Sequence, residues 1–166
     1  MRTGLLLFWL ALASLCRTEA DIPIQPDVDV EKLKGRWYPV QLVMNFGEVN
    51  KMAAVGRDIT PLDSESLNVK VEFIFDGECF KENFILRQTE QPGIFTGGNS
   101  TVRFVECDYE ASCIYYATRQ QLQVLQMESR LREPSDDSKE KFKKMAERLG
   151  FSPEKIVDIP QAEQCP

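Results

Sequence analysis

The sequence predicts an all-β fold of eight short antiparallel strands followed by a single helix. Three observations favour this fold. Apolar and polar residues alternate with period two in several short segments, turn residues separate these segments at intervals of roughly ten residues, and a helical period is found only near the C-terminus. A sheet of such hairpins must close or double over to protect its edge strands. The 166 residues suffice for one domain with a sizeable core.

Residues 1–20 are expected to be a secretory signal peptide and not part of the fold. Arg2 supplies a positive start, residues 5–15 form an apolar run, and Ala20 is a small residue suited to cleavage. The apolar run is too short to span a membrane. We therefore expect the mature domain, residues 21–166, to be secreted and free in the extracellular space, without membrane insertion.

The first strand is expected over residues 36–44, with Gly35 just before it and Trp37 near its start. Glycine permits a sharp turn and close packing, and tryptophan is large enough to plug the closed end of a small β-structure. An ordinary core tryptophan would explain the same two residues. A polar loop over residues 45–52 and a weaker strand over residues 53–62 follow.

The following strands are expected to form hairpins. The clearest alternation places four apolar side chains on one face of a strand: Leu67, Val69, Val71 and Phe73. Asp76-Gly77 predicts a tight turn into a returning strand over residues 79–87. The remaining strands are expected over residues 94–96, 101–106, 113–118 and 122–130.

One amphipathic helix is expected after the strands. Its apolar side chains have the spacing i, i+3, i+4, i+7 and are Phe142, Met145, Ala146 and Leu149. Ser135 or Ser138 would cap its start, and Gly150 would end it. The opposite, lysine-rich face is interpreted as a solvated surface and not as a binding patch. A last short strand is expected over residues 156–159.

Composition excludes several classes of function. The formal net charge is −6, and removal of the signal peptide makes it one unit more negative, so nothing favours binding to nucleic acid or anionic membranes. The chain contains no histidine, the commonest general base and a frequent zinc ligand. Hydrolytic catalysis is therefore disfavoured, although an enzyme built on carboxylates, cysteine, lysine or tyrosine stays open. We expect no cofactor and no metal.

Four cysteines remain in the mature chain: Cys79, Cys107, Cys113 and Cys165. An even number in an oxidising compartment predicts two disulfides, and four cysteines allow three pairings. No two of them have the spacing C-x-x-C, which disfavours a metal site.

A possible modification site lies in the turn after residue 98. Asn99-Ser100-Thr101 is an N-glycosylation sequon that follows two glycines in a chain expected to be secreted. The loop position predicts that the Asn99 side chain is accessible. Asn99 is therefore a candidate glycosylation site.

Three separated motifs now appear in a characteristic order: Gly35-x-Trp37 on the first strand, Asp108-Tyr109 in a late hairpin turn, and Arg130 at the end of the eighth strand. With these motifs the mature chain resembles the lipocalin family over essentially its whole length. The resemblance implies an eight-stranded antiparallel up-and-down β-barrel, the lipocalin calyx, with one C-terminal α-helix packed outside. It also implies a cation–π contact of Arg130 over Trp37. The motif residues would then mark the fold and not a chemical site.

The resemblance also implies a pairing for the cysteines. Lipocalins commonly join a cysteine on the fourth strand to one near the C-terminus, which corresponds here to Cys79 and Cys165. Cys107 and Cys113 would then bridge the hairpin between the sixth and seventh strands. Cys107 stands where the family pattern has threonine, so this second bridge departs from the usual arrangement.

A closed barrel of eight strands has room for one small ligand. Its wall would come from the apolar face of each strand and from one tyrosine hydroxyl whose inward position the resemblance implies: Leu67, Val69, Val71, Phe73, Phe84, Leu86, Phe95, Val102, Phe104 and Tyr115. Such a lining suits a hydrophobic ligand such as a fatty acid, retinoid, steroid or odorant. The alternative interpretation is that the same side chains fill a solid core.

Two further function classes are weighed against a carrier. One lipocalin branch is an isomerase with a nucleophilic cysteine on the second strand, but residues 53–62 contain no cysteine, so we expect no enzyme. The other class is an interaction protein that acts through its surface, with a cell-surface receptor as partner. Siderophore binding would need several cations inside the barrel, whereas Lys70, Lys81 and Arg103 have outward parity. We expect a monomer or a weak dimer.

Overall fold

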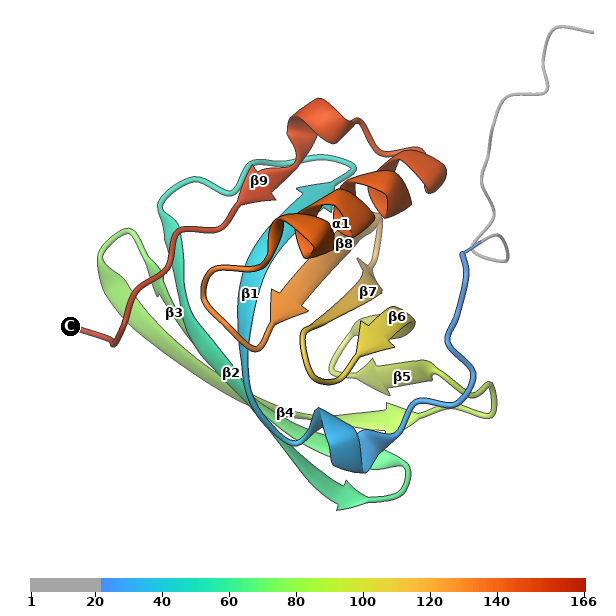
Figure 1. The fold of residues 1–166 in the computed structure, drawn as a ribbon. Coiled ribbons are helices and arrows are strands. Elements are labelled where there is room, and N and C mark those ends of the chain that lie inside the picture. The colour runs from blue at the N-terminus through green and yellow to red at the C-terminus, as the bar shows by residue number, and fades with distance from the viewer. Residues whose placement is uncertain (1–21) are drawn as a thin grey trace, which may run out of the picture.

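The computed structural model describes residues 22–166, which form a barrel with one helix lying against its outside (Figure 1). The strands are β1 (Gly35–Met44), β2 (Met52–Asp63), β3 (Ser66–Phe75), β4 (Glu78–Gln88), β5 (Ile94–Gly97), β6 (Ser100–Asp108), β7 (Ser112–Arg119), β8 (Leu122–Ser129) and β9 (Val157–Asp158). The helices are the 3-10 turns η2 (Val30–Leu33) and η3 (Pro153–Lys155) and the α-helix α1 (Asp136–Arg148). In this part of the chain, no helix combines the length and apolar character that a membrane span requires.

The barrel closes because β1 pairs with both β8 and β2. The strands follow the order β2-β3-β4-β5-β6-β7-β8-β1-β9, and the additional pairing of β2 with β1 joins the two sides of the sheet. Each of these pairings is antiparallel, as expected from a succession of hairpins. The eight-stranded antiparallel barrel with a helix outside confirms the fold class predicted from the sequence.

The C-terminal segment completes the barrel where β1 and β2 diverge. β1 contacts β2 only from Gly35 to Trp37, and farther along the same edge β9 pairs with Gln41 and Leu42. Beyond β9, the backbone of Ala54 exchanges hydrogen bonds with residues 160 and 162. A disulfide from Cys79 to Cys165 then joins this segment to the start of β4.

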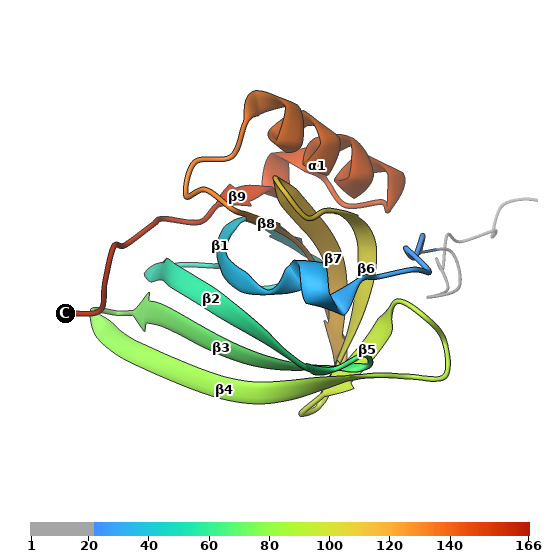
Figure 2. The ribbon, with the colours of Figure 1, turned by 60° about the horizontal axis from the view of Figure 1, so that its bottom comes forward.

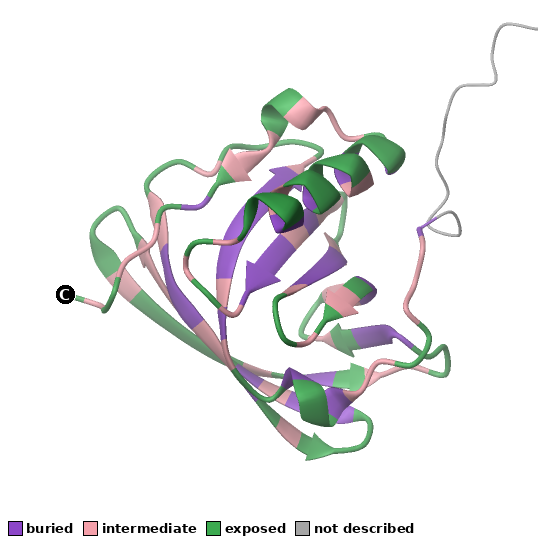
Figure 3. Cartoon of the chain, in the orientation of Figure 1, coloured by how far each residue is buried: buried purple, intermediate pink, exposed green. Residues whose placement is uncertain are grey.

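Helix α1 packs on the outer face of β1, β7 and β8, as Figure 2 shows from below the view of Figure 1. Ser135 caps the helix by accepting a hydrogen bond from the Ser138 backbone N–H. Phe142 and Ala146 are fully buried against the sheet, and Figure 3 shows the contrast between this face and the exposed face. The sheet partners are Val40, Val43, Ile114, Tyr116, Leu125 and Met127. The helix covers the outer face of these three strands, and the barrel interior lies on their inner face. Their apolar side chains can therefore face the helix while polar ones face the cavity.

One end of the barrel is sealed by Trp37, which is 1% exposed. The guanidinium of Arg130 lies 3.8 Å from the centre of the Trp37 ring, and Trp37 Nε1 donates a hydrogen bond to the Leu33 carbonyl at 2.8 Å. Arg130 also donates to the backbone carbonyls of residues 32, 34, 36 and 109. Gly35 has a φ of +107°, and a β-carbon there would lie 3.3 Å from Arg130 Nη1, so glycine suits this position.

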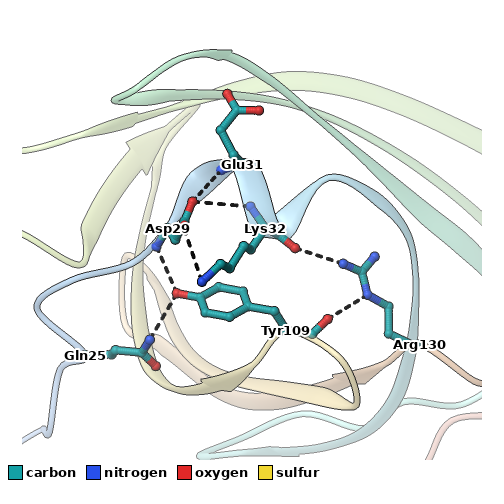
Figure 4. A network of polar contacts seen from close by, with 6 residues as sticks. All are labelled: Gln25, Asp29, Glu31, Lys32, Tyr109 and Arg130. Atoms are coloured by element: carbon teal, nitrogen blue, oxygen red, sulfur yellow. Dashed lines mark hydrogen bonds and ion pairs between the residues drawn. The ribbon is translucent and has the colours of Figure 1, made fainter.

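Tyr109 ties the N-terminal segment to the same end (Figure 4). Its hydroxyl accepts hydrogen bonds from the Asp29 backbone N–H at 2.8 Å and from Gln25 Nε2 at 3.1 Å. Asp29 in turn caps η2 through its carboxylate. Asp108 holds the adjacent turn by accepting from the Glu110 backbone N–H at 3.0 Å. The motif residues thus lie together at the sealed end and contribute to closing the barrel.

Candidate functional site

The barrel encloses a cavity of about 490 Å³. This volume is within the range of cavities that bind small molecules. Leu33 and Trp37 form its sealed end, and residues 97–100, in the β5–β6 turn region, contribute to its lining. The side chains therefore leave a hollow inside the barrel, where the alternative interpretation placed a solid core.

Most of the residues expected to line the barrel do so. The structure places eight of the ten on the cavity wall: Leu67, Val69, Val71, Phe84, Leu86, Val102, Phe104 and Tyr115. The seven without Tyr115 form an apolar surface contributed by β3, β4 and β6. Such a surface favours the apolar part of a ligand, because every apolar group that leaves water to contact it gains free energy.

Two expected lining residues, Phe73 and Phe95, do not contact the cavity. Phe73 lies nearer the tip of the β3–β4 hairpin, where its ring stacks on Phe80 with 5.4 Å between the ring centres. Phe95 is fully buried and packs edge-to-face against Phe104, which itself forms the wall. Both side chains lie on the predicted face of their strand. Alternation along a strand indicates that face, but it does not indicate how far along the barrel a side chain lies or whether another side chain separates it from the cavity.

Next to this apolar surface lies a buried polar cluster of Arg57, Tyr115 and Glu128. Arg57 Nη1 lies 2.6 Å from Glu128 Oε1 and donates a hydrogen bond to the Tyr115 hydroxyl at 2.7 Å. The Tyr115 hydroxyl donates in turn to Glu128 Oε1 at 2.8 Å. Gln126 Nε2 approaches the same carboxylate oxygen at 3.4 Å. The Arg57 side chain is 18% exposed and that of Glu128 only 4%, so water screens their attraction weakly.

The cluster is positioned by strands that meet where the barrel closes. Arg57 is on β2, directly opposite Trp37 of β1, and is therefore near the sealed end of the cavity. Tyr115 is on β7 and pairs with Gln126 of β8. Polar side chains from β2, β7 and β8 thus converge on one wall, while β3, β4 and β6 provide the apolar wall.

Burial and pairing shift the pKa values within the cluster. Burial raises the pKa of the Glu128 carboxyl, and the nearby Arg57 charge opposes this shift. Burial also raises the pKa of the Tyr115 hydroxyl well above its ordinary value. For Arg57, burial acts to lower the pKa, but the Glu128 charge and Tyr115 outweigh it and the pKa is raised. Tyr115 and Arg57 therefore keep their protons at neutral pH, and Glu128 is the group most sensitive to acidification.

One donor in the cluster is unused. Arg57 Nε is buried and has no hydrogen-bond partner among the described residues. A buried donor without a partner costs free energy. The cluster therefore combines a closed ion pair with one guanidinium donor that the protein leaves unsatisfied.

Sequence reasoning missed Glu128 because it took the apolar parity of each strand to face inward. Arg57 shares its face of β2 with Ile59, which also lines the cavity, but no residue of that strand was predicted to line it. On β8 the apolar residues Leu125 and Met127 face outward, where α1 covers them, and Gln126 and Glu128 face the cavity. A strand covered by a helix buries both faces, so its polar residues need not point to solvent. The available signal was the alternation in residues 122–130, combined with the helix expected to pack outside.

Two more charged residues line the cavity, but both are exposed to solvent. These are Glu82 of β4 and Arg119 of β7. Cys113 also lines it, and its sulfur is bonded to Cys107, so the structure contains both disulfides expected from the sequence. Asn99 lies in the β5–β6 turn, is exposed, and contributes to the same lining.

Comparisons with known proteins agree with this geometry. Residues 34–163 match the family described as the lipocalin / cytosolic fatty-acid binding protein family. Epididymal secretory protein 4 of Zootoca vivipara is 29% identical over 97% of this chain and 94% of its own length. Prostaglandin-H2 D-isomerase of Felis catus is 27% identical over 98% of this chain and 93% of its own length. A solved structure of the siderocalin Ex-FABP, described as having dual ligand specificities, has a TM-score of 0.74 and 25% identity, and covers 79% of this chain and 95% of its own.

Proposed function

This chain belongs to the lipocalin family, and we propose that it is a secreted carrier that holds one small hydrophobic ligand inside its barrel. The ligand would belong to the fatty-acid, retinoid, steroid or odorant class. The observation that supports this proposal best is the cavity of about 490 Å³ with an apolar wall. Filling such a cavity with water alone is unfavourable, because apolar side chains offer water few hydrogen-bond partners.

The expected affinity follows from the area that a ligand would bury. A small hydrophobic ligand would remove roughly 250–350 Å² of apolar surface from water, which contributes on the order of 6–9 kcal/mol before association costs. A dissociation constant of 1 μM corresponds to about 8 kcal/mol, so micromolar affinity is the tightest that this range supports. Affinity in this range is suited to uptake and release by mass action, as transport requires.

A fluorescence titration tests the carrier proposal. N-phenyl-1-naphthylamine, a neutral dye that brightens in apolar surroundings, should bind saturably with one molecule per chain. Ala117→Phe, which places a large ring in the cavity, should abolish binding, whereas Thr118→Phe, at the next residue of β7 and outside the cavity lining, should not. Linear, unsaturable uptake, or equal binding by both variants, would contradict the proposal.

An isomerase is the second candidate, favoured by the similarity to prostaglandin-H2 D-isomerases. The thiol chemistry does not support it. β2 contains no cysteine, and in residues 22–166 all four cysteines form disulfides, including Cys113 at the cavity wall. A thiol reagent should therefore leave the folded mature protein unlabelled. Stoichiometric labelling without denaturation would revive the isomerase.

A siderophore carrier is not proposed, although one similar solved structure is a siderocalin. Binding a polyanionic chelate would require several uncompensated cations in the cavity. Glu128 neutralises Arg57, and Arg119 is exposed to solvent. Lys70 and Lys81 are exposed as well, and neither lines the cavity.

Secretion and glycosylation form part of the same proposal. The signal peptide, residues 1–20, lies outside the described residues, and its removal would be detected as an N-terminus near residue 21 in the secreted protein. Asn99 is exposed in a hairpin turn, so we expect a glycan there. A peptide glycosidase should lower the mass of the native glycoprotein, while Asn99→Gln protein should show no change.

A further inference from the structure

The polar end of the cavity carries no net charge. Arg57 and Glu128 are joined at 2.6 Å, and Tyr115 bridges them by accepting from one and donating to the other. The Glu128 side chain is 96% buried, since only 4% of it is exposed. Its carboxylate already receives the hydrogen bonds that the cluster offers, and Arg57 Nε is the donor left without a partner.

We propose that this cluster makes the carrier select neutral ligands with one hydroxyl or carbonyl oxygen, and that Glu128 is the residue that disfavours carboxylates. The inference rests on the proposed carrier function and specifies its ligand class. A neutral oxygen can accept a hydrogen bond from the Arg57 guanidinium, whose side chain lines the cavity and is 18% exposed, without disturbing the ion pair. The apolar remainder of the ligand would then lie along the wall formed by Val69, Phe84 and Phe104.

A carboxylate ligand would encounter a different situation at the same position. It would compete with Glu128 for one guanidinium, and two buried carboxylates that share one cation repel each other. Either the ligand or Glu128 would have to take up a proton. The other charged groups that line the cavity, Glu82 and Arg119, are exposed and have opposite signs, so they do not remove this conflict.

A displacement experiment with matched ligands tests the assignment. Decanol and decanoate share a ten-carbon chain and differ at the head group, and each is titrated against the bound naphthylamine dye at neutral pH. Decanoate is more soluble in water, so the ratio of the two dissociation constants is compared between proteins and this difference cancels. In Glu128→Gln, we expect the ratio to shift toward decanoate by at least about tenfold, with decanol changed by less than about threefold.

Glu106→Gln is the matched control, because it removes the same charge from an exposed position of β6 outside the cavity lining. Its ratio should equal that of the native protein. The double variant Arg57→Gln with Glu128→Gln should lose the gain in decanoate affinity, since the cation that attracts the ligand is gone. An unchanged ratio in Glu128→Gln, or the same shift in Glu106→Gln, would overturn the assignment.

A measurement on the native protein tests the same assignment without depending on whether the variants fold. Isothermal titration calorimetry in two buffers of different ionisation enthalpy gives the number of protons taken up on binding. Decanoate should bind with uptake of about one proton per ligand and decanol with none, because only decanoate must be neutralised. Decanoate binding without proton uptake would refute the selection of neutral ligands. Failure of dye, decanol and decanoate alike would instead refute the carrier itself.

Discussion

Replacement of Arg57 by methionine should destabilise the fold through the carboxylate that it leaves behind. Methionine keeps much of the aliphatic volume of the arginine side chain, but Glu128 retains only the Tyr115 hydroxyl and the more distant Gln126 amide as partners. Removing one partner of a buried ion pair typically costs 3–5 kcal/mol. Because the Arg57 side chain is 18% exposed, some water already reaches it, and we expect a loss of about 3 kcal/mol in the free energy of unfolding.

The double variant Arg57→Met with Glu128→Met distinguishes two causes of the lost stability: the Glu128 charge left without a partner and the loss of packing. Replacing both members of a buried ion pair by apolar residues is often neutral, so the double variant should be within about 1 kcal/mol of the native protein. Urea unfolding with the disulfides intact, followed by Trp37 fluorescence, measures all three proteins. A double variant that is no more stable than Arg57→Met would refute the explanation that the unpaired Glu128 charge causes the loss.

The loss in Arg57→Met should also depend on pH. Without the cation, burial acts unopposed by Arg57 and raises the pKa of Glu128 further above its unfolded value. A folded-state pKa that is raised means that the folded protein binds the proton more tightly, so its contribution favours folding below the unfolded pKa and disappears as pH rises through the folded pKa. The deficit relative to the native protein should therefore be small in acid and grow toward neutral pH. A deficit independent of pH would contradict this explanation.

Three further changes test the rest of the architecture. Arg130→Met removes the cation from Trp37 and should cost about 2–3 kcal/mol and shift Trp37 emission to the red; an unshifted spectrum would contradict the sealed end. Phe142→Ala, at a fully buried position under the helix, should cost about 3–5 kcal/mol in urea unfolding, and a loss below about 1 kcal/mol would contradict the helix packing. Replacing Cys79 and Cys165 by serine opens a link between residues 86 positions apart and should cost roughly 4 kcal/mol by the same assay, whereas unchanged stability would argue against a structural role for that disulfide.

The sequence allowed the barrel to be predicted because its strands obey local rules. Asp76-Gly77 forms the turn between β3 and β4, and the alternation from Leu67 to Val71 correctly identified one wall of the cavity. The helix was equally visible, since its apolar spacing at Phe142 and Ala146 corresponds to the buried face. In each case the signal lies within a few residues of the structure that it specifies.

The polar cluster could not be read in the same way because it depends on contacts between distant segments. Arg57 and Glu128 are joined only after β1 has brought β2 and β8 onto either side of it. Inward polar residues on β8 are tolerated because α1 covers the outward residues of the same strand. The periodicity of one strand indicates neither the contact between Arg57 and Glu128 nor the covering of β8 by the helix. Predicting the polar cluster would have required the strand order and the helix position together.

A crystal structure of the decanol complex would test most directly whether the cavity is a ligand site with its polar end at the ion pair. The expected density lies between the apolar wall and the sealed end, with the hydroxyl oxygen within hydrogen-bonding distance of the Arg57 guanidinium and the Arg57–Glu128 pair intact. Density for decanol outside the barrel, or a chain turned so that its hydroxyl lies beside Arg119 and its methyl end at Trp37, would contradict it.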